Sequence, residues 1–133
     1  MDARLTTLAR RCLRAAETGD MSFPQIIGAL MEAGFESYSI DFRRPRATYS
    51  LPDGDCADFP DAGERLTVAE TFDPQALKAA ISEAQQLVPG YTYAGFRRKA
   101  AAAGCVGYLV SFPGRRAVYF GRTGESHTEF FPD

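Results

Sequence analysis

The sequence predicts an α+β fold in which two tandem helix-helix-β-meander repeats pack antiparallel strands against about four helices. Two observations support the helices and strands: apolar residues follow helical spacing in four stretches, and alternate positions are apolar after each helix pair. A third supports the repeat, because eight residues recur seventy positions later. The recurring pairs are Ala33/Ala103, Gly34/Gly104, Tyr38/Tyr108, Phe42/Phe112, Arg46/Arg116, Ala47/Ala117, Tyr49/Tyr119 and Gly54/Gly124. We therefore expect a single domain over residues 1–133, with pseudo-twofold symmetry and repeats at about 3–60 and 73–132.

The first repeat begins with two predicted helices. One carries an apolar stripe that ends near Gly19; its members are Leu5, Leu8, Ala9, Cys12, Leu13 and Ala16. The other begins with Ser22 as N-cap, Pro24 in the first turn and Gln25 as the capping-box partner. Gly34 is placed to close this second helix, because glycine readily adopts the left-handed conformation of a helix end.

Alternation of Tyr38, Ile40 and Phe42 with polar residues then predicts a strand with one buried face. Turns around Pro45 and Gly54 separate it from a second strand at residues 46–51 and a third at 55–59. The third has low strand propensity. Residues 60–63 are interpreted as the junction between repeats, and residues 65–72 as either a further strand or an extended linker.

The second repeat follows the same plan. Asp73 as N-cap and Pro74 in the first turn begin its first helix, and Thr92 caps its second as Ser22 does in the first repeat. In that second helix we expect Arg97 to lie mostly outward. Strands are predicted at residues 106–112, 116–121 and 125–130.

Composition limits the function classes. A net charge of −2 gives no general attraction to nucleic acid or anionic membranes. Three cysteines without a CxxC pair indicate neither a disulfide framework nor a zinc site, and no apolar run reaches membrane-spanning length, so we expect a cytoplasmic protein. The arginine-rich first sixteen residues are also typical of a transit peptide, but the same stretch fits the repeat as a core helix.

Parts of the second repeat resemble a known family. Residues 103–108, residues 117–125 and the closing run Glu129-Phe130-Phe131-Pro132 are similar to the YbcV-like and YdfO-like family. Its members are small bacterial, often prophage-encoded proteins, sometimes labelled phage envelope proteins. The resemblance extends over essentially the whole chain. It implies an uncharacterised protein and assigns no functional residue.

One predicted strand presents a candidate metal site. Glu125, His127 and Glu129 alternate along it, and a histidine with carboxylates is a suitable ligand set for a divalent metal. The alternative is an ordinary solvated face with Phe130 on the core side. We favour the alternative, and we expect neither a metal nor a cofactor. Cys105 is likewise expected to be a core residue rather than a nucleophile.

Two basic turns are the strongest functional indication. The turns Arg43-Arg44-Pro45-Arg46 and Pro113-Gly114-Arg115-Arg116 each lie close to a repeated tyrosine. Arginine suits phosphates and carboxylates, so two such turns are a candidate site for an anionic partner. The favoured alternative is that they are ordinary solvated turns, because arginine is in excess throughout the chain. The candidate binding residues are Arg44, Arg46, Arg115, Arg116, Tyr49 and Tyr119.

Three functional hypotheses follow. The first is a non-enzymatic binding or interaction protein that meets an unknown macromolecular partner or forms a homodimer through its sheets or basic turns. The second is a nucleic-acid-associated protein that uses the arginine turns. The third is a small-ligand-binding protein or an enzyme, which requires a pocket between the repeats. An enzyme is the less favoured interpretation, because no catalytic motif occurs in the sequence.

Overall fold

The computed structural model describes residues 1–61 and 63–132, which form four helices and six strands. In the first repeat the helices are α1 (Ala3–Thr18) and α2 (Phe23–Glu32), and the strands are β1 (Ser37–Asp41), β2 (Arg46–Ser50) and β3 (Cys56–Pro60). In the second repeat they are α3 (Pro74–Gln86), α4 (Tyr93–Ala102), β4 (Cys105–Ser111), β5 (Arg116–Gly121) and β6 (Ser126–Phe130). The α+β class and the helix-helix-β order of each repeat are as predicted.

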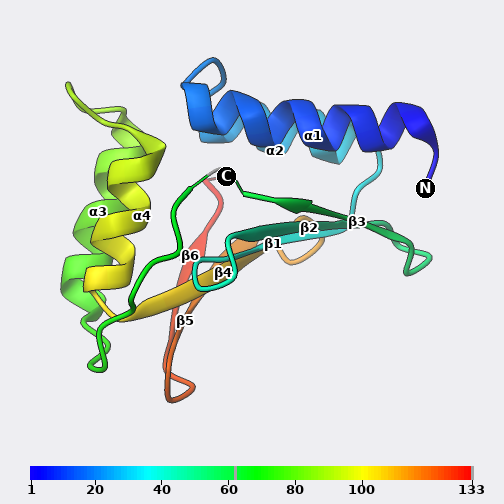
Figure 1. Ribbon diagram of the computed structural model, residues 1–133. Helices are drawn as coiled ribbons and strands as arrows, with labels where there is room; N and C mark the ends of the chain where they lie inside the picture. The colour runs from blue at the N-terminus through cyan, green and yellow to red at the C-terminus, as the bar shows by residue number, and fades with distance from the viewer. Residues whose placement is uncertain (62, 133) are drawn as a thin grey trace.

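All six strands form one antiparallel sheet in the order β3-β2-β1-β4-β5-β6. The two meanders are joined at the centre, where β1 pairs with β4 and Ser39 lies opposite Leu109. The helix pairs α1–α2 and α3–α4 cover the same side of the sheet, over the first and second meander respectively (Figure 1). One face of the sheet therefore carries the core, and the other face is open.

The helix starts are formed by the capping residues that the sequence indicates. Ser22 accepts a hydrogen bond from the backbone N–H of Gln25, and the Gln25 side chain accepts one from the N–H of Ser22. Asp73 and Thr92 each accept a hydrogen bond from a backbone N–H in the first turn of α3 and α4. These bonds satisfy donors that have no partner inside the helix.

Residues 65–72 form an extended linker without a strand. Backbone hydrogen bonds tie this linker to both repeats, from Leu66 N–H to the carbonyl of Phe42 and from Ala69 N–H to the carbonyl of Ala101. Gly104, with φ of 87°, lies so close to the linker backbone at Thr71 that a β-carbon there would collide with it. Of the predicted junction at residues 60–63, Ala62 lies outside the described residues.

The prediction that Arg97 points outward is wrong. Arg97 is 1% exposed; its guanidinium forms an ion pair with Asp61 and lies over the ring of Phe42. The helical spacing did not reveal this, because the acid that pairs with Arg97 comes from the junction between the repeats.

None of the described helices is both long and apolar enough to cross a membrane.

Candidate ligand-binding pocket between the repeats

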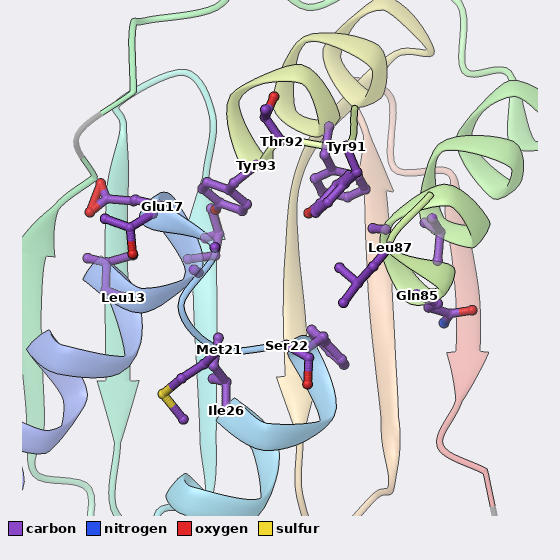
Figure 2. Close-up of a pocket in the computed structure, with 18 of the residues that line it drawn as sticks. Leu13, Glu17, Met21, Ser22, Ile26, Gln85, Leu87, Tyr91, Thr92 and Tyr93 are labelled. Atoms are coloured by element: carbon purple, nitrogen blue, oxygen red, sulfur yellow. The ribbon is translucent and has the colours of Figure 1, made fainter. Parts of the chain in front are cut away.

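A pocket of about 460 Å³ lies between the two helix pairs, above the centre of the sheet. We call it the inter-repeat pocket. Figure 2 shows Glu17 of the α1 end and Gln85 of α3 on opposite sides of it, with Tyr91 and Tyr93 on one flank and Met21 and Ser22 on another. The lining residues are Cys12, Leu13, Ala16, Glu17, Thr18, Gly19, Met21, Ser22, Phe23, Ile26, Tyr38, Ile40, Tyr49, Ile81, Ala84, Gln85, Leu87, Val88, Pro89, Gly90, Tyr91, Thr92, Tyr93, Phe96, Tyr108 and Tyr119.

The floor of the pocket is a row of four tyrosines on the four central strands. Tyr49 stacks on Tyr38 with ring centroids 5.3 Å apart, and Tyr38 meets Tyr108 edge-on at 6.3 Å. Tyr108 in turn packs on Tyr119 at 5.1 Å. All four point to the helix side, because Tyr38 lies opposite Tyr49 and Tyr108 opposite Tyr119 in the strand registers. The pairing of β1 with β4 turns two separate tyrosine pairs into one continuous surface.

The mouth is built from the two loops that connect the helices within each repeat. The end of α1 and the loop after it contribute Thr18 and Gly19, and the loop after α3 contributes Leu87, Pro89 and Gly90. Leu87 adopts φ of 48°, a left-handed conformation that is uncommon for a non-glycine residue, and its side chain is 52% exposed. An apolar side chain is therefore presented to solvent at the entrance.

The lining reproduces the internal symmetry of the chain. A shift of 68 positions carries the buried α1 residues Ala9, Cys12 and Leu13 onto the buried α3 residues Leu77, Ala80 and Ile81. The same shift pairs the lining residues Leu13/Ile81, Ala16/Ala84 and Glu17/Gln85. From the interhelical loops onward the shift is 70 positions and pairs Met21/Tyr91, Ser22/Thr92, Phe23/Tyr93, Ile26/Phe96, Tyr38/Tyr108 and Tyr49/Tyr119. Equivalent positions of the two repeats thus line the pocket together, and Glu17 and Gln85 are one such pair.

The floor of the pocket is uncharged at neutral pH. Burial raises the pKa of Tyr38 and Tyr108 well above the usual value of about 10, and burial also raises the pKa of Tyr49 and Tyr119. Tyr93 in the wall is affected in the same way, and its side chain forms a hydrogen bond with that of Tyr108. The phenols therefore remain protonated and offer hydroxyl groups and aromatic faces to a ligand.

The candidate residues named from the sequence fall into two groups. Tyr49 and Tyr119 line the pocket, whereas none of the four arginines does. Arg46 and Arg116 alternate with buried residues of β2 and β5, so their side chains lie on the opposite, open face of the sheet. In the strand register Arg46 lies opposite Asp41, at one end of β1. Arg116 lies opposite Ser111, and Ser111 lies opposite Ser37 at the other end of β1. The two arginine turns are thus at opposite ends of the sheet.

Each of these arginines has a partner within the chain. Arg46 forms an ion pair with Asp58 at 2.9 Å, and Arg44 one with Asp41 at 3.2 Å. Arg116 lies over the ring of Phe130, and its Nε donates to the carbonyl of Gly114. Arg115 donates to the carbonyl of Pro132 and lies over the ring of Phe131. Binding of an anionic partner by these turns stays a prediction.

The expected orientation of the last strand is wrong. His127 lies opposite Tyr119 and Glu129 opposite Ala117, so both face the helix side, and Phe130 on the open face is 65% exposed. The strand is the edge of the sheet, where no helix forces its bulkiest apolar residue inward. Glu125 precedes the strand and accepts a hydrogen bond from the N–H of Thr123 in the turn. His127 Nε2 lies 3.3 Å from Glu129 Oε1, and the described residues contain no cluster of three or more metal-ligating side chains.

Two of the three cysteines are buried, and Cys56 is exposed. Cys105 is buried as expected, and burial raises its thiol pKa to about 11. Cys12 is also buried, lines the pocket and has its pKa raised chiefly by desolvation. A raised pKa keeps a thiol protonated and unreactive at neutral pH, so neither residue is an activated nucleophile.

Sequence reasoning missed Glu17, Tyr91 and Tyr93 as site residues. Their signal was present in the repeat, because the segment from Tyr91 to Phe96 matches that from Met21 to Ile26. Helix capping alone is enough to explain this recurrence. The recurrence therefore did not indicate that both segments also line the inter-repeat pocket. All six tyrosines of the chain line that space.

Most of the chain is similar to a known protein family. A family model described as "Protein of unknown function (DUF1398)" matches residues 11–128. No curated protein matches the chain. The match supports the expected assignment to a family of unknown function and leaves the YbcV-like and YdfO-like naming a prediction.

Proposed function

The chain belongs to the DUF1398 family of proteins of unknown function, and from its geometry we propose that it is a non-enzymatic binding protein whose small ligand occupies the inter-repeat pocket. The observation that carries this proposal is the convergence of all six tyrosines on one cavity. A core built only for stability has no need to gather every phenol of the chain around a space that aliphatic side chains could fill.

The dimensions of the pocket support a ligand of modest size. A volume of about 460 Å³ falls within the roughly 300–1,000 Å³ of typical small-molecule sites. Its walls are largely apolar, with Leu13, Ile26 and Ile81 beside the aromatic floor, and its hydroxyl groups supply a few polar contacts. This combination of apolar walls and few polar groups is the usual composition of a ligand site.

The chemistry of the lining favours binding over catalysis. General acid-base catalysis requires a group whose pKa lies near the working pH, and nucleophilic catalysis requires an activated side chain. Burial instead raises the pKa of the buried tyrosines and of Cys12, because it stabilises their protonated forms. These pKa values are therefore moved further from neutral pH. The pocket therefore offers recognition surfaces without a reactive group of this kind.

The experiment is a titration with N-phenyl-1-naphthylamine, a neutral dye that fluoresces in apolar sites. We expect saturable binding at one site per chain. In Ala84→Phe a phenyl ring fills the space beside α3, and we expect dye binding to fall at least tenfold. Ala79→Phe is the matched control, because Ala79 is on the exposed side of the same helix and does not line the pocket.

Thermal unfolding of both variants shows whether each one folds. Absence of saturable binding to the unmodified chain would overturn the proposal. So would equal binding by a folded Ala84→Phe variant.

A further inference from the structure

We infer that the inter-repeat pocket binds an elongated, uncharged aromatic ligand with a hydroxyl or carbonyl group at each end, and that these two groups form hydrogen bonds with Tyr49 and Tyr119. This inference rests on the proposed function, since it names the chemical class of the ligand for the same pocket. It follows from the two tyrosine hydroxyls, from the distance between them and from the lining that surrounds them.

The two hydroxyls are buried donors without a partner in the chain. Tyr49 and Tyr119 are equivalent residues of the two repeats; they line the pocket and are 2% and 5% exposed. A buried tyrosine hydroxyl usually has a hydrogen-bond partner, and that of Tyr108 bonds to the side chain of Tyr93. The hydroxyls of Tyr49 and Tyr119 form no hydrogen bond with another described residue. Each can therefore donate to an oxygen of a ligand.

The positions of the two tyrosines set the length of the ligand. Tyr49 lies opposite Tyr38 and Tyr119 opposite Tyr108, at the two ends of the row. Tyr38 and Tyr108 are two residues out of register on β1 and β4. Three strand spacings and this offset separate the outer two α-carbons by about 16 Å. With a hydrogen bond of about 2.8 Å at each end, the oxygens of the ligand would be about 10 to 12 Å apart.

The lining between these ends favours an uncharged aromatic body. The rings of Tyr38 and Tyr108 lie between the outer two, and a flat aromatic ligand packs well on such rings. The described lining residues include no lysine, arginine or histidine, and the side chains of Glu17 and Gln85 point away from the pocket (Figure 2). A charged ligand would lose its hydration without meeting a buried counter-charge, which is costly.

Three stilbene probes of the same length separate the hydrogen bonds from aromatic burial. They are trans-stilbene, which has no polar group; 4-hydroxystilbene, which has one hydroxyl; and 4,4′-dihydroxystilbene, a rigid molecule with a hydroxyl at each end. All three are uncharged at neutral pH, and fluorescence titration measures their affinities. We expect each hydroxyl to raise the affinity for the unmodified chain about fivefold, the gain expected from one neutral hydrogen bond.

Removing one tyrosine hydroxyl should give a pattern that is specific to a site with two polar ends. Tyr49→Phe and Tyr119→Phe should each weaken the binding of 4,4′-dihydroxystilbene about fivefold and leave that of trans-stilbene unchanged. Because 4-hydroxystilbene can bind in either direction, each single variant should weaken its binding by no more than about twofold. The double variant should bind the three probes without a preference for hydroxyl groups.

Tyr108→Phe is the matched control. Tyr108 belongs to the same row, but its hydroxyl already bonds to Tyr93 within the chain. The variant should therefore keep the preference for 4,4′-dihydroxystilbene over trans-stilbene. Thermal unfolding shows whether each variant folds. Should one of the single variants not fold, the equivalent variant decides the inference by itself.

The outcomes distinguish the two proposals. Equal affinities for trans-stilbene and 4,4′-dihydroxystilbene would overturn the inference, and so would an unchanged preference in folded Tyr49→Phe or Tyr119→Phe. The pocket proposal would survive these results if N-phenyl-1-naphthylamine still bound and Ala84→Phe still reduced its binding. If the dye and all three stilbenes failed to bind, both proposals would fall.

Discussion

The Nε atom of Arg97 in α4 lies 3.3 Å from Oδ2 of Asp61 at the junction between the repeats, and solvent reaches 2% of one side chain and none of the other. A second guanidinium nitrogen of Arg97 donates to the carbonyl of Glu64. The pair joins the second repeat to the end of the first meander, because the N–H of Asp61 also bonds to the carbonyl of Pro45. It thereby ties the start of the linker to α4.

Truncating one partner of this pair should be strongly destabilising. Arg97→Ala leaves the Asp61 carboxylate buried without a counter-charge, so we expect a loss of about 3–5 kcal/mol in the free energy of unfolding. Urea denaturation measures the change. Arg98→Ala is the control, because the exposed ion pair of Arg98 with Glu64 should contribute less than about 1 kcal/mol. Similar losses in the two variants would show that the buried pair has no special role.

A small substitution at Gly63 tests the same region by another route. A β-carbon on Gly63 would overlap the Arg97 guanidinium, so Gly63→Ala must displace it from Asp61. We expect a loss of about 1–3 kcal/mol in stability. Gly28→Ala should behave oppositely, because Gly28 is in α2 with no atom near the added methyl group, and alanine stabilises a helix by about 0.5–1 kcal/mol over glycine. Chemical denaturation of both variants measures whether each substitution lowers or raises the free energy of unfolding. An unchanged free energy of unfolding in Gly63→Ala would show that the linker accommodates the added methyl group.

The buried tyrosines should limit stability at high pH. Burial raises the pKa of Tyr38, Tyr49, Tyr93, Tyr108 and Tyr119 in the folded state, while the unfolded chain titrates near 10. Their contribution is complete below pH 10 and is lost above it, because only the unfolded state then releases these protons. The loss approaches about 1.4 kcal/mol per pH unit for each such tyrosine.

Phenolate absorbance and circular dichroism, recorded together from pH 8 to 12, measure this effect. We expect the tyrosines to ionise cooperatively as the fold is lost. Tyr119→Phe should make the decline in stability less steep. Independent ionisation near pH 10 in a chain that keeps its secondary structure would contradict the expected burial.

Much of the fold was predictable because its determinants are local. Helix starts depend on residues three positions apart, such as Ser22 and Gln25 or Thr92 and Gly95, and these contacts are present as expected. Strand faces follow from alternation, which placed Tyr38 and Tyr108 correctly on the covered side. The same alternation misplaced Phe130, because at an edge strand either face can be exposed and periodicity alone cannot choose between them.

The sequence by itself determined the repeat, the helix caps and the tyrosines that point toward the helices. The tertiary structure alone decided that β1 pairs with β4, which places the tyrosines of both repeats in one row. It also decided that Arg97 meets Asp61 and that Glu17 and Gln85 line opposite sides of one cavity. The physical reason is that local propensity and periodicity report on neighbours within a few residues. The ion pair of Arg97 with Asp61 and the pairing of β1 with β4 join residues 36 to 74 positions apart, and their meeting depends on the packing of the whole chain.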